Sequence, residues 1–364
     1  MKFDPKIYST SNLFKPSSGE LESYFDHLSR GTIVNLFEDR FRDYHSSQYC
    51  LSFSTGFWAL VASIIAKTNK GGAKDVLMPS MTYRRLADVV NWTGMVPKFI
   101  DIDPNTLALS VDKLSQSIDQ DSALILPVHP IVNCCPVQQL IDVGRQHNVP
   151  VLFDAVESVH ETVSGKRVGS FGVGEVFSLH ASKLINGIEG GYVCTDDQEF
   201  FDKLKSITTT SSSKYRLPYI QADIHPLHCV YALAGLDAIE RNVSHNRQVY
   251  EAYEQQLKGH PFVRLLHFDQ SEQTSFKNIV VEFTETSPVS RDDCVKQLNF
   301  LGIQCRAHYY PPLHDKSASY ATKKTDLKST NELKNLFLNL PCGQRFAPEN
   351  AKSVVVELNK LFGL

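Results

Sequence analysis

An aspartate and a lysine that lie 29 residues apart, Asp154 and Lys183, could together hold an aromatic aldehyde cofactor. Asp154 ends the apolar segment 149–154, which is typical of a buried strand, and Lys183 ends the segment 177–183. A lysine amine can form a Schiff base with pyridoxal phosphate while an aspartate pairs with the pyridinium nitrogen of its ring. Glycines within 187–191 indicate a backbone that lies close to a neighbour. The pattern predicts chemistry of the aminotransferase type, although an aspartate at a strand end can also be a plain cap and a lysine an ordinary surface residue.

A second group of residues could bind the phosphate of such a cofactor. Thr55 and Gly56 lie between a predicted strand, 48–53, and a predicted helix, 56–68. The first turn of a helix offers free N–H groups and the positive end of its dipole to an anion. Ser178 could supply a further hydroxyl. The same turn is also typical of a plain helix cap, so it does not identify a phosphate site by itself.

Two more residues could contact the cofactor ring. Tyr83 follows a predicted short strand, 75–79, and could stack on the pyridine ring, although a tyrosine at the start of a helix is usually a packing residue. Glu157 lies three residues after Asp154 and could face the phenolic oxygen of the cofactor, or it could be a solvated acid.

The elements that must position these residues alternate along the first part of the chain. This rhythm predicts a mostly parallel sheet with helices on both faces, and such sheets bind ligands at the carboxyl ends of their strands. The predicted strands are 48–53, 75–79, 96–101, 123–128 and 149–154, and the predicted helices are 33–44, 56–68, 83–92, 111–118 and 137–147.

The pattern changes in the last third of the chain. We predict a long helix at 227–257 with a bend near Asn242, a half-buried strand at 276–285, and a helix at 290–301 that Ser290 caps and Gly302 ends. Ala347-Pro348 opens a last helix, and the polar segment 206–214 is a predicted connector near the site. We therefore expect a large domain at 1–240 and a small α+β domain at 241–364.

Length and composition are those of an ordinary globular enzyme. The chain has 364 residues, a formal net charge of −3 and 42% hydrophobic residues, which indicates two domains and gives no sign of a nucleic-acid or membrane partner. No secretory peptide and no membrane-length apolar run is visible, so we expect a cytoplasmic protein. The eight cysteines form no C-x-x-C pair, and we expect free thiols and no metal site.

Taken in order, these motifs resemble the DegT/DnrJ/StrS family of sugar aminotransferases, within the fold-type-I pyridoxal-phosphate enzymes. The resemblance spans roughly residue 31 to the C-terminus, and its strong stretches are 55–60, 76–83, 99–104, 154–158, 165–170, 177–191 and 308–314. It implies an aspartate-aminotransferase-like α/β fold, with a mostly parallel seven-stranded sheet in the large domain and a small α+β C-terminal domain.

The resemblance also implies a role for each candidate residue. Lys183 would carry pyridoxal 5′-phosphate as a Schiff base and shuttle protons, Asp154 would pair with the pyridinium, and Glu157 would lie beside the phenolic oxygen. Tyr83 would stack on the ring. The phosphate contacts would come from Thr55, Gly56, Phe57 and Ser178.

Partners are implied in the same way. The protein would be a homodimer with active sites at the interface. Each site would pass an amino group from glutamate or glutamine to a keto-sugar, usually nucleotide-linked, in amino-sugar biosynthesis for a surface polysaccharide or a secondary metabolite. Cations near the acceptor could be sought among Arg84, Arg85, Lys214, Arg216 and Arg306.

Three loops depart from the family pattern. The segment 222–227 lacks the asparagine that usually reaches the phosphate in the neighbouring subunit, and Asp223 or His225 stands near that place. The segments 208–213 and 131–135 also differ, so the acceptor could be atypical. Two alternatives remain. A pyridoxamine-phosphate sugar dehydratase would carry histidine in place of Lys183, and a non-catalytic relative would only bind a sugar nucleotide.

Overall fold

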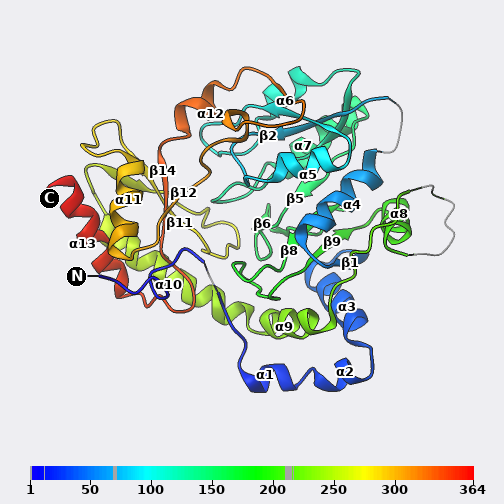
Figure 1. Ribbon diagram of the computed structural model, residues 1–364, viewed down its shortest axis with the longest axis horizontal. Helices are drawn as coiled ribbons and strands as arrows, with labels where there is room; N and C mark the ends of the chain where they lie inside the picture. The colour runs from blue at the N-terminus through cyan, green and yellow to red at the C-terminus, as the bar shows by residue number, and fades with distance from the viewer. Residues whose placement is uncertain (1, 12, 69–71, 210–214, 216) are drawn as a thin grey trace.

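The computed structural model describes residues 2–11, 13–68, 72–209, 215 and 217–364 and arranges much of the chain around one long sheet (Figure 1). The strand order is β1-β9-β8-β5 followed by β4-β2-β3-β13, and parallel bridges from Ile125 to Val151 and from Val128 to Asp154 join the two halves. β9 runs antiparallel to both of its neighbours, and the other pairings are parallel. The strands are β1 Tyr49–Phe53, β2 Asp75–Pro79, β3 Val96–Ile100, β4 Ser122–Ile125, β5 Phe153–Asp154, β8 Glu175–Ser178, β9 Gly191–Thr195 and β13 Lys323–Lys324.

This arrangement confirms the predicted fold class, with one addition. Seven strands come from residues 49–195 and form the predicted mostly parallel sheet, whereas β13 comes from the last part of the chain and extends the sheet beside β3. Solved structures of the same fold are described with the candidate site below.

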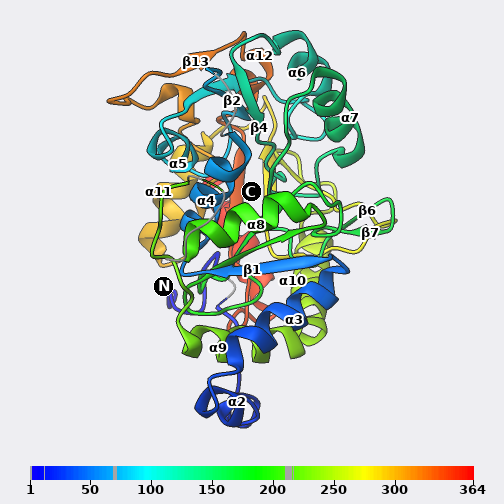
Figure 2. The same cartoon turned by 90° about the vertical axis from the view of Figure 1, so that its right-hand side faces the viewer.

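Helices cover both faces of the sheet because successive strand side chains point to opposite sides. Leu51 and Phe53 pack with the central helix α4, Gly56–Thr68, whereas Cys50 packs on the opposite face with α3, Ile33–His45, and α9, Pro226–Asp237. Figure 2 shows α8, Gln198–Thr208, on the other side of β1 from α3 and α9. The remaining elements of this region are α1 Ser18–Glu22, α2 Phe25–Ser29, α5 Leu86–Trp92, α6 Val111–Ser117, α7 Val137–His147, β6 Thr162–Val163 and β7 Lys166–Arg167.

The C-terminal region has its own antiparallel sheet in the order β10-β11-β14-β12, with a separate apolar core. The predicted caps of α11 are confirmed, since the Ser290 hydroxyl accepts the N–H of Asp293 and Gly302 ends the helix with a φ of 93°. The elements are α10 Ile239–Leu257, β10 Val263–Leu265, β11 Ile279–Phe283, α11 Arg291–Leu301, β12 Arg306–Ala307, the 3-10 turn η1 Leu313–Asp315, α12 Lys328–Leu333, β14 Phe337–Leu340 and α13 Asn350–Phe362.

Two segments link the regions on either side of the predicted boundary at residue 240, which stays a prediction. Near the N-terminus, the N–H of Phe3 donates to the carbonyl of Leu301 over 2.7 Å, and the N–H of Cys342 donates to the carbonyl of Ser9 over 2.8 Å. In the opposite direction, the segment 313–334 returns from the C-terminal region to the edge of the long sheet. Figure 1 shows both chain ends on the side of the C-terminal region.

Several predicted elements need correction. The long helix predicted at 227–257 is two helices that meet at Ala238, not one helix bent near Asn242. The break lies where the packing partner changes, because α9 packs against α3 and α10 packs against α13.

Other predicted bounds shift by a few residues. The helix predicted from Tyr83 begins at Leu86, and the helix predicted from Ala347 begins at Asn350. The strand predicted at 149–154 is continuous over 153–154 alone, with a bridge at Val151, and the strand predicted at 276–285 covers 279–283. Of the predicted connector 206–214, residues 206–208 belong to α8 and residues 210–214 lie outside the described part of the chain.

None of the helices in the described part of the chain combines the length and the apolar character that a bilayer span requires.

Candidate active site

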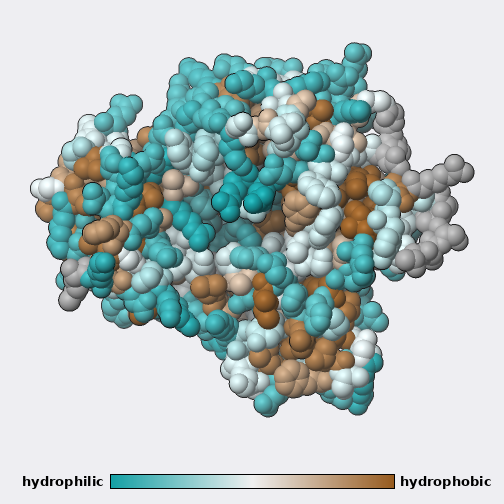
Figure 3. All heavy atoms as spheres, viewed as in Figure 1, coloured by the Kyte–Doolittle hydropathy of each residue, from teal (hydrophilic) through white to brown (hydrophobic). Residues whose placement is uncertain are grey.

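The predicted site residues follow four strands that end at the same edge of the long sheet. Thr55 and Gly56 follow β1, Tyr83 follows β2, Asp154 ends β5, and Ser178 ends β8. This edge is where open α/β sheets bind ligands. Figure 3 shows the corresponding face hollowed near its middle, with hydrophilic side chains around the hollow.

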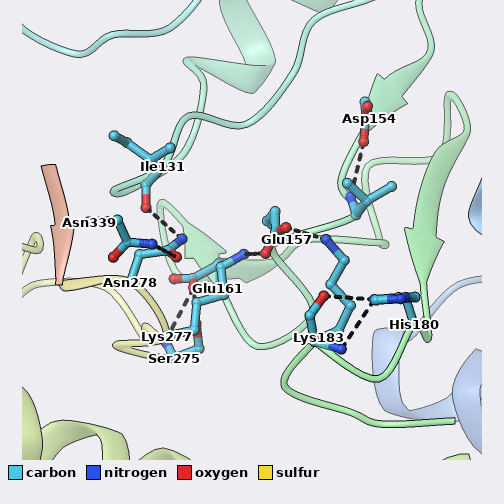
Figure 4. Close-up of polar contacts among 12 residues, drawn as sticks. Ile131, Asp154, Glu157, Glu161, His180, Lys183, Ser275, Lys277, Asn278 and Asn339 are labelled. Atoms are coloured by element: carbon cyan, nitrogen blue, oxygen red, sulfur yellow. Dashed lines mark hydrogen bonds and ion pairs between the residues drawn. The ribbon is translucent and has the colours of Figure 1, made fainter. Parts of the chain in front are cut away.

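Lys183 lies in the tight loop between β8 and β9. Its N–H donates to the carbonyl of His180 over 2.8 Å, and the N–H of Ala181 donates to the carbonyl of Ile188 over 3.0 Å, so the loop is held by its own backbone. The Lys183 side chain is 16% exposed, and its ammonium group forms an ion pair with Oε1 of Glu157 (Figure 4). The structure therefore brings together two residues that were predicted from separate motifs.

Glu157 also contacts a second lysine, Lys277, which was not among the predicted site residues. Nζ of Lys277 lies 2.9 Å from Oε2 of Glu157, and Figure 4 shows the two lysines reaching the carboxylate from opposite sides. Burial raises the pKa of the Glu157 carboxyl, but the charges of Lys183 and Lys277 outweigh burial and hold that pKa well below its usual range. Glu157 is therefore ionised at neutral pH.

A sequence signal for Lys277 exists in the strand pattern. Lys277 is in phase with Ile279, Val281 and Phe283 at the two-residue period of a strand, and these three residues are buried. A lysine on the apolar side of a half-buried strand is unusual unless a carboxylate compensates it.

Asp154 is buried and has one carboxylate oxygen without a partner. Oδ1 accepts the N–H of Val156 over 3.2 Å, whereas Oδ2 accepts no hydrogen bond from any described residue. Burial raises the pKa of Asp154 to about 6, against the opposing effects of the Val156 N–H and the Lys183 charge. An unpaired buried carboxylate oxygen costs free energy, and the N–H of a pyridinium ring would satisfy it. The residues present thus fit a pyridoxal group.

The predicted phosphate residues also lie together. The Thr55 hydroxyl accepts the N–H of Trp58 over 3.1 Å and so caps α4, but its hydrogen stays available to an anion. A Cβ on Gly56 would lie 3.0 Å from Cβ of Ser178, which places the end of β8 against the first turn of α4. A Cβ on Gly191 would lie 2.6 Å from the Gly56 backbone nitrogen. The glycine stretch after Lys183 therefore presses against the turn that could hold phosphate.

The other predicted contacts lie at the rim of the site or outside the described residues. Tyr83 is 45% exposed in the turn before α5, beside the exposed Arg84 and Arg85. Arg306 is exposed and donates to the hydroxyl of Ser11 over 3.4 Å. Of the remaining candidate cations, Lys214 and Arg216 lie outside the described part of the chain.

The loops that depart from the family pattern are anchored differently. Asn133 in the loop 131–135 donates to the carbonyl of His267 and accepts the N–H of Asp269 over 2.8 Å, so this loop is tied to the C-terminal region. His225 caps α9 by accepting the N–H of Leu227 over 3.3 Å, and Asp223 is exposed.

The stretch 308–314 adds side chains from the C-terminal region. Burial lowers the pKa of His308 to about 4, against the opposing charge of Glu157, which places this imidazole at the site in its neutral form. Ser80, just after β2, lies 2.7 Å from Nδ1 of His314 through its hydroxyl oxygen. The C-terminal region thus closes one side of the site.

Comparisons with known proteins match nearly the whole chain to one family of aminotransferases. The model of the DegT/DnrJ/EryC1/StrS aminotransferase family matches residues 21–359. GDP-perosamine synthase of Caulobacter vibrioides is 28% identical over 347 residues, which cover 92% of this chain and 91% of that protein.

Solved structures show the same fold. DesI, crystallised in the presence of its TDP-sugar product, superposes with a TM-score of 0.89 at 25% identity and covers 99% of this chain and 93% of DesI. Escherichia coli GDP-4-keto-6-deoxy-D-mannose-3-dehydratase with bound hydrated PLP superposes with a TM-score of 0.79 at 21% identity, covering 94% and 99% of the two chains. The second likeness concerns the fold alone.

Proposed function

We propose a nucleotide-linked keto-sugar as the amino acceptor of this enzyme, on the premise that the chain belongs to the DegT/DnrJ/EryC1/StrS aminotransferase family. As a member of this family, the chain is an aminotransferase that depends on pyridoxal phosphate. The acceptor assignment draws on the similarity to GDP-perosamine synthase and to DesI with its TDP-sugar product. Glutamate or glutamine is the proposed amino donor, and the product is an amino sugar for a polysaccharide or a secondary metabolite.

The observation that carries the cofactor site is a largely buried lysine, Lys183, at the same edge of the sheet as the buried Asp154, which has one carboxylate oxygen without a hydrogen bond. Asp154 would hold the pyridinium nitrogen through Oδ2, and Thr55, Gly56, Phe57 and Ser178 would hold the phosphate. Tyr83 would cover one face of the ring, because its exposed side chain is not committed to the core. The cofactor, when bound, supplies an electron sink for the carbon that loses its proton.

Lys183 has two roles in this proposal, and both depend on its proton. Its amine must be neutral to attack an aldehyde, so Lys183 must first give up the proton that its ion pair with Glu157 holds. Once the donor amino acid has displaced Lys183, the free Nζ is the base that takes the α-proton from the donor. The same atom returns a proton when the keto-sugar is aminated.

A homodimer with active sites at the interface is also proposed. Tyr83, Ile188 and Leu227 belong to segments around the mouth of the site, and their side chains are 45%, 42% and 45% exposed. Exposed apolar side chains grouped beside a site are typical of a surface that a partner covers. Size-exclusion chromatography with light scattering measures the oligomeric state, and a strictly monomeric active enzyme would contradict this part of the proposal.

The absorption spectrum tests the enzyme against its alternatives. The proposal expects a yellow protein whose visible band is bleached by glutamate or glutamine and restored by the correct keto-sugar nucleotide. A Lys183→Ala protein should lack the original band and should not turn over. A yellow wild type that no amino donor bleaches would favour the non-catalytic relative. Removal of a sugar hydroxyl without transfer of nitrogen to the sugar would favour the dehydratase.

A screen of candidate acceptors then identifies the keto-sugar and its nucleotide. The pyridoxamine form of the enzyme is prepared with glutamate, separated from the donor and mixed with GDP-, dTDP- and UDP-linked keto-sugars. The correct acceptor regenerates the visible band in a single turnover. If free keto-sugars regenerate the band as well as nucleotide-linked ones, the nucleotide part of the proposal is wrong.

A further inference from the structure

Lys277 is a buried lysine from the C-terminal region that points into the cofactor site. It precedes β11, its side chain is 6% exposed, and Nζ lies 2.9 Å from Oε2 of Glu157. Burial lowers the pKa of Lys277 below its usual range, with the charge of Glu157 opposing that effect. Burying a lysine is costly unless a carboxylate compensates its charge, so the contact with Glu157 accounts for its position.

Each carboxylate oxygen of Glu157 contacts a different lysine, and the two lysines have different proposed roles. Oε1 contacts Lys183, which is the residue proposed to bond to the cofactor, whereas Oε2 contacts Lys277. If Lys183 were bonded to the cofactor, its nitrogen would no longer be an ammonium group, and Oε1 would lose this ion-pair partner. Glu157 would then be a buried carboxylate beside an oxygen-bearing ring, which favours protonation unless another cation remains.

We propose that Lys277 is a positioning residue of the cofactor site, which keeps Glu157 as an ordered carboxylate while Lys183 is bonded to the cofactor. This inference rests on the proposed function of Lys183. The pair of Glu157 and Lys277 carries no net charge, so it can lie beside the phenolic oxygen with less repulsion than a lone carboxylate. It also keeps a carboxylate in place for the ion pair that forms at each return of Lys183.

The backbone around Lys277 is fixed by buried contacts on both sides. The carbonyl of Lys277 accepts the Sγ–H of Cys342 at 3.0 Å. Ser275 donates its hydroxyl to Glu161 over 2.7 Å, and Asn278 donates its amide to the carbonyl of Ile131 over 3.2 Å, as Figure 4 shows. Lys277 is thus held in place by the protein itself and does not depend on the cofactor for its position.

Several titratable groups face Glu157 from the surrounding elements. Lys183 comes from the loop after β8, Lys277 from the segment before β11, and Asp154 and Glu161 from the chain around Glu157 itself. His308 and Tyr309 come from the loop after β12. The set is Asp154, Glu161, Lys183, Lys277, His308, Tyr309 and Cys342, the last from the segment after β14.

The direct test measures the ionisation of Glu157 without cofactor. In Lys183→Ala protein, Glu157 has lost the lysine that leaves during the reaction, and isotope-edited infrared difference spectra against a further Glu157→Gln change identify its carboxyl band. We expect a carboxylate at pH 7 in Lys183→Ala. In Lys183→Ala/Lys277→Met we expect the midpoint of the Glu157 titration to rise by about two pH units or more. An unchanged midpoint would overturn the proposal.

A matched control separates the local effect from general loss of a buried lysine. Lys98 is nearly as buried, with 11% of its side chain exposed, and it pairs with Asp119 at 2.6 Å. Lys183→Ala/Lys98→Met should therefore leave the Glu157 titration where it is in Lys183→Ala. An equal rise in this control would mean that the infrared change reports loosened packing, and it would count against Lys277.

A second measurement covers the case in which the double variant does not fold. Lys277→Met alone leaves Glu157 and Lys183 in place, and the equilibrium affinity for pyridoxal phosphate is followed by fluorescence quenching over pH. We expect an affinity loss of at least about tenfold at pH 7, rescued by Lys277→Arg and by adding Glu157→Gln. Loss without either rescue would mean a packing role. If wild-type protein binds no pyridoxal phosphate, the proposed function fails, while the infrared result on Glu157 still decides the pairing.

Discussion

The two ends of the parallel strands carry two clusters of acids and lysines that are built in opposite ways. At the amino ends, Nζ of Lys323 donates a hydrogen bond to Oδ2 of the buried Asp75 over 2.9 Å. The same Nζ lies 2.8 Å from Oδ1, an ion-pair contact that makes no hydrogen bond, and Lys98 lies 3.8 Å from Asp75. At the carboxyl ends, Oδ2 of Asp154 has no hydrogen-bond partner among the described residues. The amino-end cluster is Asp75, Lys98, Asp119, Asp121 and Lys323, and the carboxyl-end cluster is Asp154, Glu157, Lys183 and Lys277.

The difference separates a structural role from a functional one. The charge of Asp75 is matched by Lys98 and Lys323, which supports a structural role for the amino-end cluster. Asp154 is left short of one donor in a buried place, and Lys183 is held by a single contact with Glu157 that it can leave. An unsatisfied buried carboxylate oxygen costs stability, and at this edge of the sheet it supports the proposal that a ligand completes the site.

Among changes at the two clusters, Lys183→Ala should have the largest effect on turnover. Since Lys183 is the proposed nucleophile and proton carrier, its loss should lower turnover by at least about 10³-fold. Stability should change little, because Glu157 keeps its contact with Lys277. Transfer of nitrogen from glutamate is measured as 2-oxoglutarate release, and the midpoint of thermal unfolding serves as the control. A variant that retains a tenth of the wild-type rate would remove Lys183 from its assigned role.

Asp154→Asn should have the next largest effect, with almost no change in volume. The amide cannot hold a positive ring nitrogen, so we expect turnover to fall by about 10²-fold or more. The measurement is single-turnover bleaching of the visible band with glutamate. Wild-type bleaching in Asp154→Asn would show that the unpaired oxygen serves some other purpose.

The pH dependence of stability should distinguish the clusters without any assay of activity. Because burial raises the pKa of Asp154 to about 6 in the folded protein, the folded state holds this proton more tightly than the unfolded chain, where the pKa is about 3.9. Cofactor-free protein should therefore lose roughly 2 to 3 kcal/mol of stability from this group as pH rises from about 4 to about 6.

Urea unfolding at several pH values measures this loss. Asp154→Asn should abolish the Asp154 part of the slope, and saturating pyridoxal phosphate should reduce it because the ring supplies the missing donor. An identical slope in wild type and Asp154→Asn would place the titration elsewhere in the molecule.

Changes at the amino-end cluster should have the smallest effects on turnover and should lower only the free energy of unfolding. Asp75→Asn leaves Lys98 and Lys323 with the neighbouring acids, and we expect a cost of about 2 kcal/mol in the free energy of unfolding. Lys323→Met should lower the unfolding midpoint less, since the Lys323 side chain is 48% exposed. Both variants should keep turnover within about twofold of wild type. A larger loss of turnover would mean that the two ends of the strands are coupled.

The sequence was most informative where local chemistry and burial agree. The helix at 56–68 was predicted with the bounds of α4, because an apolar run begins at a cap and nearly every side of the helix is covered. The bounds of α11 follow from the same local rules, because Ser290 caps its N-terminus and Gly302 ends the helix. Asp154 was predicted at a strand end, and a parallel sheet brings such ends to one edge. Glu157 and Ser178 were proposed from their positions relative to Asp154 and Lys183.

What sequence reasoning missed depends on contacts between distant segments. Lys277 meets Glu157 across 120 positions of the chain, and its two-residue phase with Ile279 was a weak sign on its own. β13 has only two residues, Lys323 and Lys324, and it forms because these residues pair with the edge strand β3. The break at Ala238 follows from a change of packing partner that no periodicity within 227–257 reveals.

The pairing of residues 3–9 with the C-terminal region has a consequence for synthesis on the ribosome. Phe3 bonds to Leu301, Tyr8 to Gln304 and Ser9 to Cys342, so the first of these partners is made almost 300 residues later. At 5 to 20 residues per second, the early segment waits for about 15 to 60 seconds before it can dock. During that time Phe3 and Tyr8 are free for a chaperone to bind, and their docking on the C-terminal region is complete only after Cys342 has been made.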